Sequence, residues 1–316
     1  MVGVVTAVAC ADQSTPASPP STVNPDGGAV PPPDDAGTSR TPGMIRVATF
    51  NVRRYFDTVC DSGNCTAGDF ESVVNQATFD ADTARIAEGI ALIDPDVIAL
   101  EEVENQHCLD ALVAKLASMG KTFPIAHLGE TGSAGSVDVA VLARGTLPEF
   151  KTHRETQIVE ADGTKTTFTR EFLEARMTFG ATKVVMFAAH FRSKVADDPA
   201  RRLAEATAAK AIVSKTATDL PTALVLLGGD LNDKPGSAPI AVLEDGGALL
   251  RVAKDIPVAA QGTYTFNGVT DAIDHIFAGA PQATRYVAKS ATVYRTGAGG
   301  FSGSDHAALA ADFTVQ

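Results

Sequence analysis

Residues 223–233 read ALVLLGGDLND, and this stretch decides how the rest of the chain is interpreted. Its apolar run, residues 224–227, is short and ends in two glycines, which is typical of a buried strand that emerges into a loop. Side chains alternate between the two faces of a strand, so we expect Asp230 and Asn232 to point the same way. The carboxylate could hold a cation or polarise a water, and the amide could donate to a phosphoryl oxygen. The alternative is an Asx turn that only caps the strand.

Segments of the same kind recur along the chain and indicate the fold class. Apolar or alternating runs predict further strands at 45–51, 97–100, 137–142, 183–190, 274–278 and 308–315. Helical spacing predicts a helix capped by Asp80 or Asp82, and others over 109–116, 199–214 and 239–243. Asp162 and Gly163 predict a hairpin turn. Strands interleaved with helices indicate an α/β (α+β) class, with two packed mixed β-sheets flanked by helices in a four-layer sandwich.

Length and charge set limits on the function. The chain has 316 residues, of which 45% are hydrophobic, and we see no internal repeat, so we expect one domain over residues 44–316. The formal net charge of −12 argues against avid, non-specific binding to a polyanion, because neutralising phosphates needs clustered lysine and arginine. A polyanionic substrate is still compatible, since local charge and metal ions can supply the positive charge.

The first 43 residues differ in composition from all that follow. Residues 1–10 are small and apolar and resemble a bacterial lipobox, with Cys10 as the lipidated residue. They lack the basic start of an export signal and are short for one, and a disordered cytosolic tail is the alternative. Residues 11–43 are mostly Pro, Ser, Thr, Gly and Asp and predict a disordered linker. We expect an exported protein, extracellular or on the outer surface, with a lipid anchor at Cys10.

The remaining cysteines agree with an exported protein. Cys60 and Cys65 bracket the turn-like sequence DSGN, where a small loop disulfide fits, and a metal clip there would lack partners at zinc-ligand spacing. Cys108 begins an amphipathic helix and is expected to be buried rather than reactive.

Polar residues stand where the apolar runs stop. They are Asn51, Glu102, His190, Asp230 with Asn232, Asp274 with His275, and Asp305 with His306. Several strands that end in functional side chains are typical of enzymes with a site at one edge of a sheet. Each residue alone has a simpler explanation as a turn, a solvated strand end, a core histidine or a helix cap. Together they suit a phosphate and a hard divalent cation, without zinc-like cysteine and histidine spacing.

These segments resemble the endonuclease/exonuclease/phosphatase family, the superfamily of DNase I. The motifs follow the family's order and are TFNV (49–52), DVIALEEVEN (96–105), AAHFRSK (188–194), GGDLND (228–233), DAIDHIF (271–277) and SGSDHAALAADF (302–313). HFRSK, followed by an arginine pair, resembles the bacterial extracellular nuclease branch, which usually has lysine where this chain has Arg192. The resemblance implies a DNase I-like fold.

The resemblance also implies roles for the site residues. Glu102 would be the principal Mg²⁺ ligand, and Asp305 would join it directly or through water. Asp230 would orient and activate the attacking water, while Asn51 and Asn232 would hold phosphate oxygens and the metal shell.

The same resemblance implies roles for two histidines. His190 would donate to a non-bridging oxygen, and Arg192 would add positive charge for the substrate. His306, supported by Asp274, would be a proton donor or a general base. A histidine backed by a carboxylate has its orientation fixed and can titrate near neutral pH.

Three positions stay open. Glu101 stands where the family usually has glutamine, so Glu101 and Glu102 could exchange roles at the metal. Asp138 could pair with His190, and His275 is expected to be structural. Several cations near the site could form a basic rim or be ordinary surface charge: Arg53, Arg54, Arg192, Lys194, Arg201 and Arg202.

We therefore expect a Mg²⁺-dependent phosphodiesterase, with Mn²⁺ or Ca²⁺ as alternative ions. Its substrate would be DNA or RNA, cleaved by in-line attack of water to leave a 5′-phosphate. The alternatives are a phosphatase or phospholipase C-like hydrolase of phospholipid or inositol phosphate, and a non-catalytic binding module of the same fold. We expect a monomer without a stable protein partner.

Overall fold

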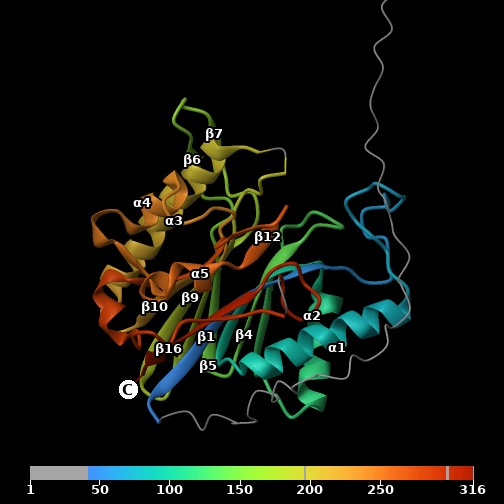
Figure 1. Ribbon diagram of the computed structural model, residues 1–316, viewed down its shortest axis with the longest axis horizontal. Helices are drawn as coiled ribbons and strands as arrows, with labels where there is room; N and C mark the ends of the chain where they lie inside the picture. Colours follow the sequence, from blue (N-terminus) through green and yellow to red (C-terminus); the bar gives the residue numbers. More distant parts are fainter. Residues whose placement is uncertain (1–41, 196, 297–298, 316) are drawn as a thin grey trace, which may run out of the picture. The chain divides into compact units, whose positions relative to one another are not determined.

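The computed structural model describes residues 42–195, 197–296 and 299–315 (Figure 1). The expected export segment, residues 1–10, and nearly all of the expected linker, residues 11–43, lie outside these ranges. The first described element is β1 (Met44–Tyr55). Among the described helices, none is both long and apolar enough to cross a membrane.

The first of two six-stranded sheets joins the two ends of the described chain. Its strand order is β15 (Thr292–Tyr294), β16 (Ala308–Thr314), β1, β2 (Val97–Val103), β4 (Asp138–Ala143) and β3 (Ile125–Gly129). β1 and β2 run parallel, and the other neighbours are antiparallel. The sheet is therefore mixed.

The second sheet has the same mixed character. Its order is β11 (Leu249–Arg251), β14 (Asp274–Gly279), β10 (Leu224–Asp230), β9 (Thr182–His190), β8 (Phe172–Phe179) and β5 (Thr146–Thr152). β9 and β10 run parallel, and the other neighbours are antiparallel. Each sheet thus has one parallel pair at its centre.

Helices cover the outer face of each sheet (Figure 1). Apolar side chains of α1 (Gln76–Ile93) and α2 (Gln106–Ser118) pack on the first sheet, and those of α3 (Pro199–Asp219) and α4 (Ala238–Glu244) pack on the second. Shorter elements complete the described chain: β6 (Ile158–Val159), β7 (Lys165–Thr166), β12 (Tyr264–Phe266), β13 (Val269–Asp271), α5 (Val258–Gln261) and the 3-10 segments Asp245–Gly247, Val252–Asp255 and Ala280–Arg285. The expected four-layer α/β architecture, DNase I-like in its two flanked sheets, is confirmed.

The alternation of side chains along the strands decides which residues meet between the sheets. In β10, Leu224 and Leu226 pack in the core between the sheets, whereas Val225 and Leu227 face the helices. Each fully buried aliphatic side chain contributes roughly 1.5–3 kcal/mol through apolar burial. If β10 slipped by one residue, the side chains that now pack between the sheets would face the helices, and the reverse. This would disrupt the packing on both faces, so the register is strongly fixed.

Two local expectations have clear outcomes. The hairpin at Asp162 and Gly163 is confirmed, since β6 and β7 pair antiparallel on either side of it. The N-cap expected at Asp80 or Asp82 is wrong, because Asn75 caps α1 and its Oδ1 accepts from the Thr78 N–H at 3.0 Å. α1 begins earlier because Phe79 extends its apolar face and is buried in a stack with Tyr55.

The cysteines adopt the expected states. Cys60 and Cys65 form a disulfide, and Cys108 is a buried free thiol. The disulfide closes the loop between β1 and α1, and Glu71 fastens the same loop by accepting from the backbone N–H groups of Asp61 and Ser62. This polar excursion is therefore held by a covalent bond and charge-assisted hydrogen bonds in addition to apolar contacts such as that of Phe70 with Phe56.

Gly229 offers a test of the pairing between the two parallel strands of the second sheet. It lies opposite Ala189, and a Cβ on residue 229 would lie 1.8 Å from the Ala189 carbonyl oxygen. Gly229→Ala should therefore lower the free energy of unfolding by about 3 kcal/mol, as measured by urea denaturation. Gly299→Ala is the control, because nothing lies within 4 Å of its Cβ position. Equal stabilities of the two variants would contradict this account of β9 and β10.

Candidate active site

Two rows of polar side chains, one on each sheet, form the candidate site. On the first sheet, Asn51 of β1 pairs in register with Glu101 of β2. On the second sheet, Asp230 of β10 lies between His190 of β9 and Asp274 of β14. Along each strand, all five lie at the alternate positions whose side chains face the space between the sheets. Asn51, Glu101, His190 and Asp230 are also near the carboxyl ends of parallel strands. The packing of the two sheets therefore brings the rows together.

Asp230 is the residue on which the contacts converge. Its Oδ2 accepts from Asn51 Nδ2 at 3.1 Å, which joins the two rows. His190 Nε2 lies 3.5 Å from Oδ2, and His306 Nε2 lies 3.9 Å from it. Burial, followed by the charge of Asp274, raises the pKa of Asp230 to about 7. A carboxylate with such a pKa can accept a proton from water near neutral pH.

His306 is fixed by a carboxylate from the second sheet. Its Nδ1 lies 3.0 Å from Asp274 Oδ2 and 3.1 Å from Oδ1. Burial alone would lower the pKa of His306, but the charges of Asp274 and Asp230 outweigh it and raise the pKa to about 10. Ser304 sets the backbone, because its Oγ donates to the Asn51 carbonyl and accepts from the His306 N–H. His306 is therefore a protonated imidazole at neutral pH, oriented by Asp274.

His190 has the opposite electrostatic character. Burial, then the charges of Arg170 and His306, hold its pKa well below the ordinary value, so the ring is neutral. The expected pairing of His190 with Asp138 is wrong. Nδ1 of His190 has no hydrogen-bond partner among the described residues, and Asp138 Oδ1 instead accepts from the Thr131 N–H and the Ser136 hydroxyl at 3.3 Å each.

The two adjacent glutamates have different surroundings. Glu101 is fully buried, and its Oε1 accepts from the Thr49 hydroxyl at 2.8 Å. Burial, then the charges of Asp274 and Asp230, hold its pKa well above the ordinary value. Glu102 has φ +67°, which turns it out of the strand; its Oε1 accepts from Asn51 and its Oε2 from the Arg54 N–H. Glu102, and not Glu101, therefore presents a carboxylate at the site.

The donors present fit a hard divalent cation. Glu102 and Asp230 are joined through the Asn51 amide, and Asp305 follows the same edge, where its carboxylate lies 3.5 Å from Arg53 Nε. Ligand atoms of Asp230, Asp274 and His306 all lie within 4.8 Å of one another. Carboxylate and amide oxygens without thiolates are the ligand set of Mg²⁺, Mn²⁺ or Ca²⁺, and not of a structural zinc ion.

A family model described as "Endonuclease/Exonuclease/phosphatase family" matches residues 46–295. The chain belongs to this family. The assignment makes the protein a metal-dependent phosphoric ester hydrolase, in agreement with the donor set at the sheet edge. No curated protein sequence matches the chain significantly.

Solved structures show the same fold as this member of the endonuclease/exonuclease/phosphatase family. Truncated TDP2 from Caenorhabditis elegans is 16% identical, with a TM-score of 0.58 over 86% of this chain and 98% of that one. D. rerio TDP2, complexed with a single-strand DNA product, is 18% identical, with a TM-score of 0.53 over 86% and 99%. The catalytic domain of human Nocturnin, with a bound sulfate anion, is 15% identical, with a TM-score of 0.57 over 87% and 95%.

Asn232 differs from the extended geometry that its spacing predicted. β10 ends at Asp230, and Asn232 adopts a left-handed conformation with φ +54°. Its N–H donates to Asp230 Oδ1 at 2.9 Å, and its Nδ2 donates to the Phe191 carbonyl at 3.1 Å. The Asx turn is therefore present, and it serves the site because it fastens the Asp230 carboxylate from one side.

The expected basic rim is only partly formed. Arg202 is buried and binds Asp197 at 2.9 Å and Asp233 at 3.0 Å, so it braces the loop after β10. Arg201 donates to the Thr167 carbonyl. The backbone of Arg192 is held by Arg202 and by Glu205, while its side chain is half-buried. The downstream arginine pair is thus structural, in contrast to the expectation that it could line the site.

Sequence reasoning missed Arg170, and it missed the contact between Tyr264 and His306. Arg170 donates to the Phe191 carbonyl at 3.1 Å, and the charges of Glu102 and Asp230 act on it. It follows a polar stretch without strong periodicity, which gave no signal. Tyr264 lies beside His306, with ring centroids 4.7 Å apart, and residues 264 and 306 form a β-bridge. Their sequence separation hid this contact, whereas His275 is structural as expected and bonds to the Asp233 carbonyl.

The His306–Asp274 pair can be tested without substrate. In Asp274→Asn the loss of the carboxylate charge should lower the His306 pKa from about 10 toward its ordinary value of roughly 6.5, since burial then opposes protonation more effectively. NMR titration of the imidazole protons in EDTA measures the change. Asp271→Asn removes an exposed carboxylate paired with Lys234 and should leave His306 unchanged. An unaltered titration in Asp274→Asn would contradict the assignment.

Proposed function

We propose that the protein is a Mg²⁺-dependent phosphodiesterase that hydrolyses DNA or RNA. The observation that carries this proposal is the contact between the polar side chains of the first sheet and those of the second. Asp230, with a pKa raised to about 7, is joined by the Asn51 amide to Glu102 and faces a protonated His306. This arrangement places a proton acceptor and a proton donor 3.9 Å apart at one site, and phosphodiester hydrolysis needs both roles.

The side chains divide the reaction between them. Asp230 takes a proton from the attacking water, and its orientation is fixed by Asn51 and the Asn232 N–H. His306, held by Asp274, gives a proton to the leaving oxygen. His190, neutral and buried, donates to a phosphoryl oxygen without adding charge that would oppose the His306 cation.

The metal ion would be held by Glu102, with Asp305 in support. A bound divalent cation supplies charge stabilisation worth several kcal/mol as negative charge develops on the phosphoryl oxygens. His190 is the chain's own donor to the same oxygens, whereas both hydrogens of Asn51 Nδ2 bind Glu102 and Asp230.

A nucleic-acid substrate is supported by the neighbours of the fold and by local charge. D. rerio TDP2 was crystallised with a single-strand DNA product, and human Nocturnin with a sulfate anion. Arg53, Arg54 and Arg170 stand near the site in a chain with a net charge of −12, so the positive charge needed by a polyanion is concentrated there. We place the protein in the bacterial extracellular nuclease branch on the HFRSK motif.

The function can be tested on the full chain with four substrates: plasmid DNA, RNA, sphingomyelin and inositol phosphates. We expect Mg²⁺-dependent hydrolysis of a nucleic acid that EDTA abolishes, and losses of about 10²–10⁴-fold in Asp230→Ala and His306→Ala. Asp219→Ala, at the exposed end of α3, should keep wild-type activity. Turnover on lipid or inositol phosphate alone would exclude the nuclease function, and the absence of any metal-dependent turnover would leave only a binding module.

We further propose that the protein is exported and anchored by a lipid at Cys10. The disulfide between Cys60 and Cys65 supports an oxidising compartment, where such bonds persist. The lipobox-like residues before Cys10 and the linker-like composition up to residue 43 fit a tether.

Metabolic labelling tests the anchor. Cells that express the full chain and are fed radiolabelled palmitate should incorporate label into the wild type and not into Cys10→Ala. Cys108→Ala controls for labelling at another free thiol, because that residue is buried. Labelling of both chains to the same extent, or of neither, would exclude lipidation at Cys10.

A further inference from the structure

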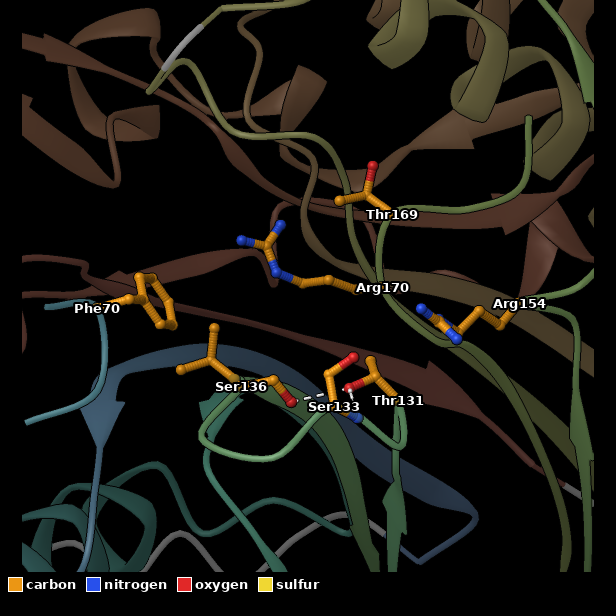
Figure 2. A pocket seen from close by; sticks show the side chains of 8 residues that line it. Phe70, Thr131, Ser133, Ser136, Arg154, Thr169 and Arg170 are labelled. Atoms are coloured by element: carbon orange, nitrogen blue, oxygen red, sulfur yellow. Dashed lines mark hydrogen bonds between the residues drawn. The ribbon is translucent and has the colours of Figure 1, made fainter. Parts of the chain in front are cut away.

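A pocket of about 170 Å³ is lined by residues that include Arg170 (Figure 2). Its walls come from three separate stretches: the disulfide loop, the loop between β3 and β4, and the segments that flank β6 and β7. The residues used below are Phe70, Thr131, Ser136, Arg154, Thr169 and Arg170.

The charged residues that line the pocket are all cationic. Its polar side chains are two guanidinium groups and several hydroxyls, and no carboxylate is among its lining residues. Arg154 Nη1 pairs at 3.2 Å with the exposed Glu155 carboxylate, which is not part of the lining. Arg154 Nε and Thr169 Oγ1 are buried and have no hydrogen-bond partner among the described residues. A buried polar group left unsatisfied costs roughly 1–3 kcal/mol, so these groups are set for an acceptor that enters the pocket. An anion with several oxygens meets this requirement.

Arg170 connects the pocket with the catalytic rows. In Figure 2 its guanidinium points into the space between Phe70 and Thr169. One of its nitrogens, Nη1, donates to the Phe191 carbonyl directly after β9. It is also close enough to Glu102 and Asp230 for their charges to act on it. A group held by Arg170 in the pocket would therefore be a near neighbour of the group that reacts at Asp230.

An aromatic wall closes one side of the pocket. Phe70 has 49% of its surface exposed, although it is a large apolar side chain. It packs edge-on against Phe56, and the Arg54 guanidinium lies 4.9 Å from its ring centre. The Arg54 N–H binds the Glu102 carboxylate, so this wall is tied to the expected metal ligand. An exposed ring beside cationic donors is how proteins bind an unpaired base and its phosphate.

We propose that this pocket binds the phosphate next to the scissile one in a single strand of nucleic acid, with the adjoining base against Phe70. The inference rests on the nuclease function proposed above and adds the strand state and a second phosphate subsite. Arginine suits this subsite because its planar fork matches phosphate oxygens. Thr131 and Ser136 hydroxyls, which bond to each other, border the same space.

The experiment combines a substitution in the pocket with a change of one phosphate linkage in the strand, and it measures the effect of each on binding. Fluorescence anisotropy in EDTA measures the dissociation constant of a labelled single-stranded oligonucleotide, so binding is separated from cleavage. Each linkage in turn is replaced by an uncharged methylphosphonate. Wild type should bind about tenfold more weakly when the linkage beside the scissile one is neutral, and Arg154→Gln should lose about tenfold with the natural strand. In Arg154→Gln, the same methylphosphonate should not weaken binding further, because the guanidinium that contacts this phosphate has already been removed.

Two further variants sharpen the result. Phe70→Ala should weaken binding about tenfold through lost stacking, without a position-specific response to methylphosphonate. Lys215→Gln, an exposed cation on α3 paired with Asp219, should bind as wild type does. Thermal melting checks that each variant is folded.

The outcomes separate the two proposals. Additive losses for Arg154→Gln and the methylphosphonate, or unchanged binding in both pocket variants, would overturn the second subsite even if the protein cleaves nucleic acid. Coupled losses with no metal-dependent cleavage would sustain phosphate binding in the pocket and exclude the nuclease. Displacement of the strand by inositol phosphates at equal affinity, lost in Arg154→Gln, would overturn the assignment to nucleic acid.

Discussion

The hydrogen bond from Asn51 to Asp230 is the contact on which the site depends, because it joins the two sheets at their functional edge. It forms between buried groups, where an unsatisfied partner would cost more than the bond contributes in water. Asn51 also binds Glu102 through the same nitrogen and holds the Arg53 N–H through its oxygen. One amide thus aligns the expected metal ligand, the expected base and the end of β1, which carries Arg53 and Arg54.

The charge balance of the site follows from this arrangement. Glu101, Asp230 and Asp274 gather between the sheets, and their mutual repulsion together with burial raises the pKa values of Glu101 and Asp230. His306 is a buried cation that faces these carboxylates. The charges of Asp274 and Asp230 raise its pKa. A divalent cation at Glu102 would relieve the remaining repulsion, so the need for a metal is already present in the carboxylates that the register brings together.

Much of the site could be predicted from the sequence because its residues end apolar runs. The β10 run ends at Asp230 and the β9 run ends at His190, and parallel pairing of two such runs brings their ends together. Asp274 instead begins β14, and antiparallel pairing with β10 brings the start of that strand to Asp230. Strand periodicity did not predict the backbone conformation of Asn232. Its left-handed backbone depends on the Asx turn that Asp230 forms with the Asn232 N–H.

The parts that could not be predicted owe their place to tertiary pairing. β8 alternates buried apolar residues with Glu174 and Arg176, and the charged positions obscured its period. Glu174 is tolerated in a buried position because Arg176 of the same strand and the more distant His153 bind it. Phe70 and Arg170 likewise meet only because the disulfide loop and the segment before β8 converge.

The catalytic residues and the residues of the proposed substrate pocket therefore lie on different kinds of structure. The catalytic rows lie on strands, where a shift of one residue would turn every side chain to the opposite face, so the spacing of Asp230, His190 and Asp274 is locked by the whole core. The pocket wall lies on loops, which can change in sequence without disturbing that register. A chain built in this way can keep the reaction fixed while sequence changes around Phe70, Arg154 and Arg170 alter the proposed substrate pocket.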